Sequence, residues 1–306
     1  MRKAVLTAAG ALGAAGAAAL AYATAIEPYD IRIEHIELTS PRLPAAFDGY
    51  TVYQISDIHM RQMGRRERKI RTILKSLPPA DLITLTGDLI HTRAGTDPFF
   101  ELAKSFQSRD GAYSVFGNSE HKNGVRPGLF AAQLAGRGLH PLLNAHTVIA
   151  RGGESIVLAG VDDPVNDLDR LSDALAGAPP DKFILLMMHS PDSVADAVAQ
   201  DVDVVLSGHT HGGQVCFPFI GAPYTHSLFG KEMSSGYYAG MKLRKVIGIA
   251  PGRTQMYVTR GLGVSGLALR FLCPPELTIV TLRRGAPSFR ALPETPARTL
   301  ESASIR

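Results

Sequence analysis

The 306-residue chain has no tryptophan and only two cysteines, Cys216 and Cys273. Two cysteines are too few for a disulfide framework of the kind that stabilises small secreted domains. Cys216, beside a glycine- and histidine-rich segment, is therefore predicted to be a core residue. No aromatic side chains are interleaved with the basic run at residues 61–71. Because single-strand binding relies on aromatic stacking, we expect no nucleic-acid partner; no obligate protein partner is evident, and there are no internal repeats.

Charge is absent from residues 4–26, which are rich in alanine and glycine. This stretch is long enough to span a bilayer as a helix, although it is only mildly apolar. The favoured interpretation is an uncleaved signal anchor. The alternatives are a signal peptide, with an A-x-A-like cleavage site at residues 21–23, and a soluble alanine-rich helix. Basic residues 2–3 precede the stretch, acidic residues follow it and a twin-arginine pair is lacking. The positive-inside rule thus predicts that the remaining chain lies outside the cytoplasm; the alternative is the cytoplasmic membrane face.

The remaining composition, 45% hydrophobic and 20% charged, is typical of a folded globular unit with one large or two modest cores. We expect an anchor or signal segment at 1–26, a globular domain at 27–283 and a flexible tail at 284–306. Strands alternate with helices before a final third that is richer in strands, which favours two sheets packed face to face with helices outside. The expected helices are 66–77, 97–108, 126–136 and 192–199. The expected strands include an edge strand within 31–44 and, near the end, 236–238, 242–252, 255–261 and 277–282.

Five apolar, β-branched runs each stop at polar residues of the metal-binding type. Such runs predict buried strands, and side chains at the carboxyl ends of successive strands converge on one crevice. Residues two apart in an extended segment point the same way, so each pair in D-x-H and H-x-H can reach one point. Oxygen mixed with imidazole nitrogen suits Mn²⁺, Fe or Zn²⁺ better than Ca²⁺ or a thiolate site. The predicted ligands, too many for one tetrahedral ion and so indicating two ions, are Asp57, His59, Asp88, Asn118, His189, His209 and His211.

The ordered blocks D-x-H, GD, GN, H and GHTH resemble the motif set of the calcineurin-like metallophosphoesterases over residues 50–285. The HGGQ extension at 211–214 and the segment 257–282 are similar to one branch, the membrane-anchored or exported bacterial phosphodiesterases, whose relatives include UDP-2,3-diacylglucosamine pyrophosphatases. The resemblance implies an α/β protein with a four-layer α/β/β/α sandwich of two mixed sheets flanked by helices. It also implies two divalent ions (Mn, Fe or Zn) and a location at the plasma membrane of a bacterium.

Residue by residue, the resemblance implies two metal positions that share Asp88 as a bridge. Asp57, His59 and His211 would hold one metal, and Asn118, His189 and His209 the other. The implied reaction is hydrolysis of a phosphodiester or pyrophosphate bond by a metal-bridging hydroxide, with a membrane-associated or lipid-linked substrate. A metal-binding or protein-interaction module on a weakened phosphoesterase fold, and a phosphomonoesterase, are the alternatives.

One block departs from the family pattern of GNH followed by an acid. Here the sequence is GNSEH, with Ser119 at the histidine position, Glu120 at the acid and His121 one residue later. Asn118, Glu120 and His121 are the predicted catalytic residues. Serine is a poor proton donor near pH 7, which leaves two alternatives. Protonation of the leaving group is weaker or is carried out by water or His121, or the leaving group needs little protonation, as does the phosphate of a pyrophosphate bond.

Several polar residues near these blocks leave two interpretations open. Asp162 and Asp163 are at the site rim or in a turn, and His91 and Arg93 face substrate phosphate or belong to a solvated loop. The run 61–71 forms a helix near the site mouth that meets anionic headgroups, or a solvated helix face. His146 and His226 are expected at the surface.

Overall fold

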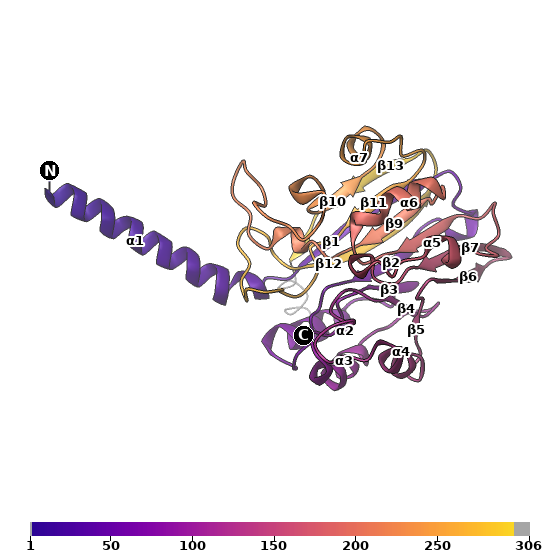
Figure 1. The fold of residues 1–306 in the computed structure, drawn as a ribbon, viewed down its shortest axis with the longest axis horizontal. Coiled ribbons are helices and arrows are strands. Elements are labelled where there is room, and N and C mark those ends of the chain that lie inside the picture. The colour runs from indigo at the N-terminus through magenta and orange to yellow at the C-terminus, as the bar shows by residue number, and fades with distance from the viewer. Residues whose placement is uncertain (1, 297–306) are drawn as a thin grey trace.

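The protein folds into two mixed β-sheets packed face to face, as the computed structural model shows for residues 2–296 (Figure 1). The first sheet has the order β13-β1-β12-β2-β3-β4-β5, with β14 paired to β1, and the second has the order β10-β11-β9-β8-β7-β6. The first sheet comprises β1 (Arg32–Ser40), β2 (Tyr50–Ile55), β3 (Leu82–Thr86), β4 (Ala112–Val115), β5 (Leu139–Pro141), β12 (Glu276–Arg284), β13 (Ser288–Ala291) and β14 (Thr295–Pro296). The second comprises β6 (Ala145–Arg151), β7 (Glu154–Gly160), β8 (Ile184–Met187), β9 (Val204–Ser207), β10 (Gly236–Tyr238) and β11 (Gln255–Val258).

Helices cover the two outer faces of the sheets. Those of the domain are α2 (Arg65–Ser76), α3 (Thr96–Ala103), α4 (Pro127–Ala135), α5 (Leu171–Ala174), α6 (Val194–Ala199) and α7 (Gly240–Ile247), with short 3₁₀ turns between elements. The first three pack on the first sheet and the last three on the second. This arrangement confirms the predicted α/β/β/α sandwich of two mixed sheets.

Side-chain alternation along the strands produces these layers. In β8, Leu185 and Met187 belong to the cluster between the sheets, whereas Ile184 and Leu186 belong to the cluster beneath α5, α6 and α7. Successive strand residues point to opposite faces, so a run that is apolar at every position is buried on both sides.

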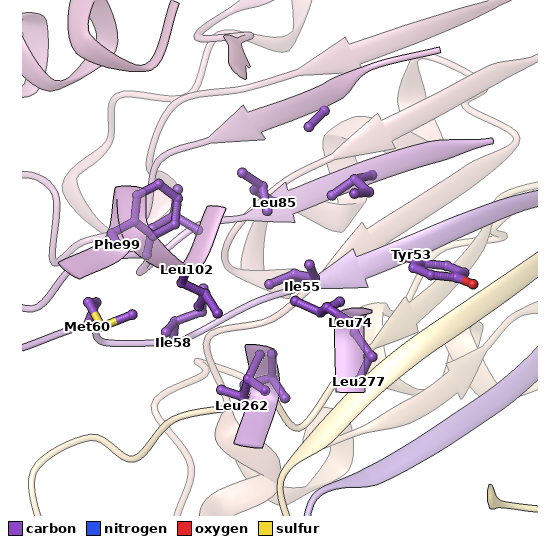
Figure 2. Packing of buried hydrophobic residues seen from close by; sticks show 14 of the residues in the cluster. Tyr53, Ile55, Ile58, Met60, Leu74, Leu85, Phe99, Leu102, Leu262 and Leu277 are labelled. Carbon is purple, nitrogen blue, oxygen red and sulfur yellow. The ribbon is translucent and has the colours of Figure 1, made fainter. Parts of the chain in front are cut away.

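The outer cluster of the first sheet shows the same logic from the helix side. Ile70, Ile73 and Leu74 of α2 lie three and four residues apart, so they share one helix face and pack against the sheet. Figure 2 shows Leu74 near Ile55 and Leu277, with Phe99 and Leu102 of α3 on the same sheet face. This packing holds the segments after β2 and β3 rigidly.

The prediction of a strand at 242–252 is wrong. Residues up to Ile247 form α7, in which Leu243 is buried and Val246 and Ile247 are partly buried, a helical spacing. Gly248 ends the helix at φ 78°, a left-handed conformation that glycine adopts without strain.

The segment after residue 284 also differs from its prediction as a flexible tail. β13 and β14 pair antiparallel with β1, and the Phe289 ring stacks on Tyr237 with centroids 4.4 Å apart. As a result β1 lies between β12 and β13 instead of at a sheet edge. Residues 297–306 of the predicted tail lie outside the described residues.

Helix α1 (Arg2–Ala25) projects away from the sandwich (Figure 1). Among the described residues, Gly10–Tyr29 is the one helical segment with the length and composition to cross a membrane. The foot of α1 is attached to the domain: the Arg270 N–H donates to the Ala23 carbonyl at 2.9 Å, and the Glu27 carboxylate accepts the Leu272 N–H at 2.8 Å.

Candidate metal centre

All five predicted strand ends meet at one edge of the sandwich. β2, β3 and β4 run parallel in the first sheet, and β8 and β9 run parallel in the second. The residues that follow these strands are almost entirely buried, with His209, at 7% exposed, the most accessible of the six predicted Asp and His ligands. The sheet topology therefore collects polar groups from both sheets in one interior site.

One cluster contains Asp57, His59 and His211, whose candidate ligand atoms lie within 4.8 Å of one another. The Nε2 atoms of His59 and His211 are 3.1 Å apart, and His211 Nε2 is 3.4 Å from Asp57 Oδ1. This trio is the one that the family resemblance assigns to the first metal. Its oxygen and two nitrogens fit a divalent cation.

A second cluster contains Asp57, Asp88 and His189. The carboxylate of Asp88 lies between two imidazoles, with Oδ2 3.3 Å from His59 Nε2 and Oδ1 3.5 Å from His189 Nε2. Asp88 thus presents one oxygen to each side of the site, the arrangement that a bridging carboxylate requires. Asp57 takes part in both clusters, a sharing that the sequence did not predict.

Asn118 and His209 are the two remaining predicted ligands of the second side. His209 Nδ1 is 3.1 Å from His189 Nε2. The side-chain oxygen of Asn118 is buried and has no hydrogen-bond partner. Because a buried acceptor without a partner costs about 1–3 kcal/mol, this oxygen is suited to a cation. His189 Nδ1 lies 2.9 Å from the Thr86 carbonyl, to which it donates, leaving Nε2 free as an acceptor.

The backbone at these ligands is unusual. Asp57, His59, Asp88, His209 and His211 all have φ between 48° and 69°. Non-glycine residues rarely adopt this left-handed region, and such outliers concentrate at functional sites. The extended-segment argument does not hold as stated, because β2 and β9 end before these residues, but Asp57 and His59 do share one cluster as predicted. His209 and His211 reach His189 and His59, respectively, instead of one shared point.

Close approach explains two glycines of the motifs. A Cβ atom at Gly117 would clash with Asp88 Oδ1, and one at Gly208 would clash with Asp57 Oδ2. Backbone can come this near the carboxylates only where a side chain is absent.

The electrostatics indicate that the buried carboxylates draw a positive charge into the site. Burial raises the pKa of Asp57 to about 6. His189 opposes this shift, and the negative charge of Asp88 adds to it. Burial would also raise the pKa of Asp88, but His189 and His59 hold it well below its usual range. Burial opposes protonation of His189, yet Asp88 raises its pKa to about 10. A proton on His189 and a cation beside Asp88 are alternatives, since each neutralises the same carboxylate.

The residues of this site lie within a segment that matches a known protein family. The family model described as calcineurin-like phosphoesterase matches residues 50–213, which include every predicted ligand. The chain belongs to the calcineurin-like phosphoesterases. The family and the clustered Asp and His residues make it a metal-dependent phosphoesterase.

Relatives of this phosphoesterase include proteins with membrane segments. It is 33% identical over 290 residues to YkuE, an uncharacterized metallophosphoesterase of Bacillus subtilis, covering 90% of this chain and 93% of that protein. An uncharacterized metallophosphoesterase of Aquifex aeolicus is 28% identical over 84% of this chain and 94% of its own. A transmembrane protein with metallophosphoesterase domain of Danio rerio is 27% identical, over 83% of this chain and 57% of that protein. Together with α1, the Danio rerio relative, which is named a transmembrane protein, suggests membrane association.

Glu120 of the phosphoesterase faces backbone rather than open space. Its fully buried carboxylate accepts the N–H groups of Asp88, Leu89, Ile90 and Gly117 at 2.8–3.0 Å. Burial and Asp88 raise the pKa of this carboxyl to about 8. All four contacts are donors, however, so the ionised, acceptor-only form fits them best. Glu120 joins the loops after β3 and β4, and its prediction as a catalytic residue stays untested.

Ser119 and His121 lie on different sides of Glu120. The Ser119 N–H donates to Asp88 Oδ1 at 2.7 Å, and its hydroxyl is 3.3 Å from His59 Nδ1. His121 Nε2 is 2.8 Å from Asp162 Oδ1. Ser119 therefore contacts two of the clustered residues directly, while His121 is paired with an acid from the loop after β7.

The other polar candidates lie around this centre. The His91 ring lies 5.7 Å from His59 and its Nε2 is 2.7 Å from Arg61. The exposed His226 ring is 5.9 Å from His209. Asp163 is buried and accepts the Val165 N–H in a turn, whereas Arg93 lines a separate surface hollow with Asp97. His146 bonds the Ala174 carbonyl, and Cys216 is half-buried.

Sequence reasoning missed Arg270. Its fully buried guanidinium donates to the carbonyls of Arg260, Gly261, Gly263, His211 and Cys273. Its Nη2 is also 3.4 Å from His211 Nδ1. Arg270 holds the loop of His211 against the segment after β11. No local pattern around residue 270 signals this, because each partner comes from a distant turn or from the loop itself.

A cavity of about 410 Å³ opens beside His59. Arg61, Arg65 and Arg66 line it, together with Tyr29 from the foot of α1. Arg66 is paired with Glu67 at 2.7 Å, and the Arg65 guanidinium lies 4.4 Å from the centre of the Tyr29 ring. The basic run predicted near the site mouth therefore does border the site.

Proposed function

We propose that the protein hydrolyses a phosphodiester or pyrophosphate bond with two divalent ions, on a membrane-associated or lipid-linked substrate. The observation that carries this proposal is the position of the Asp88 carboxylate, which lies between His59 and His189. The buried Asn118 side-chain oxygen, which has no hydrogen-bond partner, supports it. Asp57, His59 and His211 would hold one ion, and Asn118, His189 and His209 the other, with Asp88 between them.

The chain's own groups prepare such a site before any ion binds. When bound, two ions would lower the pKa of a shared water and neutralise charge on the phosphoryl oxygens. Burial lowers the pKa of His59 to about 4 and that of His209 to about 3, so both imidazoles are neutral and able to donate a lone pair at pH 7. The Ser119 N–H orients Asp88, and Glu120 fixes the backbone that carries it.

The cavity beside His59 supports a substrate that extends beyond one phosphate. Arg61 and Arg65 line a space large enough for a further anionic or polar group, and guanidinium groups bind phosphate in a bidentate manner. A monoester would leave this space unfilled. Tyr29 places the same cavity at the foot of α1, which favours a substrate held at a membrane.

The leaving group is the point on which the alternatives differ. His121 is the nearest replacement in sequence for the missing histidine, and its hydrogen bond to Asp162, opposed by burial, raises its pKa. A protonated imidazole near neutral pH is what a general acid requires. If His121 does not contribute, the chemistry is confined to good leaving groups, such as a phosphate.

The test compares bis-p-nitrophenyl phosphate with p-nitrophenyl phosphate, using the full-length protein and Mn²⁺. We expect faster turnover of the diester, dependence on added metal, and no turnover of either by Asp88→Asn. A preference for the monoester would instead identify a phosphomonoesterase. Hydrolysis of neither substrate by metal-loaded protein would identify a binding module.

A further inference from the structure

Most of the exposed large apolar side chains among the described residues gather at one end of the molecule. Besides those on α1 and in the turn after it, they belong to the β9–β10 and β11–β12 loops. This apolar loop surface comprises Phe217, Phe219, Ile220, Tyr224, Leu228, Leu267 and Leu272. Soluble proteins rarely expose contiguous apolar patches without a partner.

The most prominent part is a tight loop whose tip faces solvent. The Phe217 N–H donates to the Gly221 carbonyl at 3.0 Å, and the Gly221 N–H donates back at 2.9 Å. At the tip, Phe219 is fully exposed with φ 66°, and Leu228 farther along the loop is 89% exposed. The loop closed by the two Phe217–Gly221 hydrogen bonds holds Phe219 outward, and the Leu228 N–H is held separately by Asp192 Oδ1 at 3.0 Å.

This surface adjoins the foot of α1 through Phe217 and Leu272. The Phe271 ring lies 6.4 Å from Tyr22 of α1 and 6.3 Å from Phe217, so it joins the helix to the loop. The Cys216 N–H donates to the Phe271 carbonyl at 2.8 Å. Figure 1 shows the loops before β10 and after β11 on the side of the sandwich from which α1 leaves.

We propose that the apolar loop surface docks on the lipid bilayer, with Phe219 and Leu228 entering the headgroup–acyl boundary. Continuity with α1 identifies the occupant, because a face around the foot of a membrane helix lies against the interface of that membrane. Exposed aromatic and aliphatic side chains are the ones that lie there. Membrane docking is a separate property from the proposed hydrolysis. It rests on the proposed function only in that both place the protein at a membrane.

Docking has a consequence for access to the site. The cavity lined by Tyr29 and Arg65 adjoins the foot of α1, so a domain pressed to the bilayer brings these residues to headgroup level. The positive charge of Arg65, and that of Arg61 beside it, matches anionic lipid phosphates. The metal centre then receives its substrate from the membrane plane rather than from solution.

The absence of tryptophan permits a direct test. Phe219→Trp and Leu228→Trp, each made in the full-length protein, introduce a single tryptophan, whose emission is excited selectively over that of the tyrosines. The variants are reconstituted in phosphatidylcholine–phosphatidylglycerol vesicles with or without acyl-chain bromination. The matched control is Val148→Trp. Val148 is also an exposed apolar residue, but it lies on β6, at the opposite edge of the second sheet from β10.

We expect brominated lipid to quench the two loop tryptophans at least about twofold more than the control, with blue-shifted emission. Equal quenching at all three positions would overturn the proposal. A blue shift that depends on protein concentration and not on bromination would assign the surface to a second copy of the chain, and would also overturn it. The readout needs no substrate, so its failure is distinct from failure of the proposed hydrolysis. Leu267→Trp repeats the test if a variant misfolds.

Discussion

The Nε2 atoms of His59 and His211 lie 3.1 Å apart, although His59 follows a strand of the first sheet and His211 a strand of the second. Burial lowers the pKa of both rings, to about 4 for His59 and well below the usual range for His211. Two neutral imidazoles at this distance need either a shared proton or a cation between them. The metal centre therefore joins the two halves of the sandwich.

Asp88→Asn is expected to reduce phosphodiester hydrolysis to background. The amide keeps the size of the side chain but removes the charge that faces both His59 and His189. Steady-state rates with Mn²⁺ measure the effect, and circular dichroism checks that the fold is retained. Hydrolysis at the wild-type rate by a folded Asp88→Asn protein would exclude the bridging role.

Ser119→Ala is expected to lower metal affinity or activity about 10–100-fold, the usual effect of losing a group that orients a ligand. The variant removes the hydroxyl beside His59 Nδ1 but keeps the backbone N–H that binds Asp88. Titration with Mn²⁺ measures the change. Ser114→Ala, on the buried β4 strand, is the control, because its hydroxyl has no hydrogen-bond partner; a similar loss in that variant would show that the effect is not specific.

Arg270→Met is expected to destabilise the protein by about 3 kcal/mol or more, because several buried carbonyls lose their donor at about 1–3 kcal/mol each. The free energy of unfolding by urea measures it. Arg290→Met removes a largely exposed guanidinium from its pair with Glu37, to which Arg283 stays bound, and a loss below about 1 kcal/mol is expected there. Equal losses in both variants would contradict the proposed role of Arg270 in holding the His211 loop.

Glu34 gives a prediction about pH. Burial and the nearby Glu276, opposed by Arg260, raise the pKa of Glu34 from 4.5 to about 7. The native state then binds more protons than the unfolded state between these values, so this group makes stability fall as pH rises from about 4.5 to about 7. Glu34→Gln should flatten the fall in melting temperature over that window.

Glu37→Gln is the control of opposite sign. Burial would raise the pKa of Glu37, but hydrogen bonds from Arg290 and Arg283 lower it. Its stabilisation is present above the unfolded pKa and lost on acidification. A Glu34→Gln profile parallel to that of the wild type would refute the assignment.

The clustering of the Asp and His residues could be predicted from the sequence because each of them follows a strand within a few residues. β2, β3, β4, β8 and β9 are short apolar runs that end in glycine, aspartate, asparagine or histidine, and parallel pairing brings such ends together. The direction of each side chain could not be predicted in the same way. Left-handed backbone at His209 and His211 sends the two rings to different partners, whereas an extended segment would point both the same way.

Long-range contacts account for the remaining differences. α7 contains Val246 and Ile247, which favour strands locally, but packing with Leu243 on the second sheet selects a helix. β13 forms because β1 offers an edge and Tyr237 a stacking partner. Arg270 binds carbonyls whose proximity follows from the completed fold, so no sequence window contains its role.

The metal content of the full-length protein tests the central claim most directly. After loading with Mn²⁺ and removal of free ion, the account predicts two equivalents per chain. It predicts about one in Asn118→Ala, which loses the unpartnered side-chain oxygen, and two in Asn118→Asp, which keeps an oxygen there. One equivalent or none in the wild-type protein, or no difference between the two Asn118 variants, would contradict it.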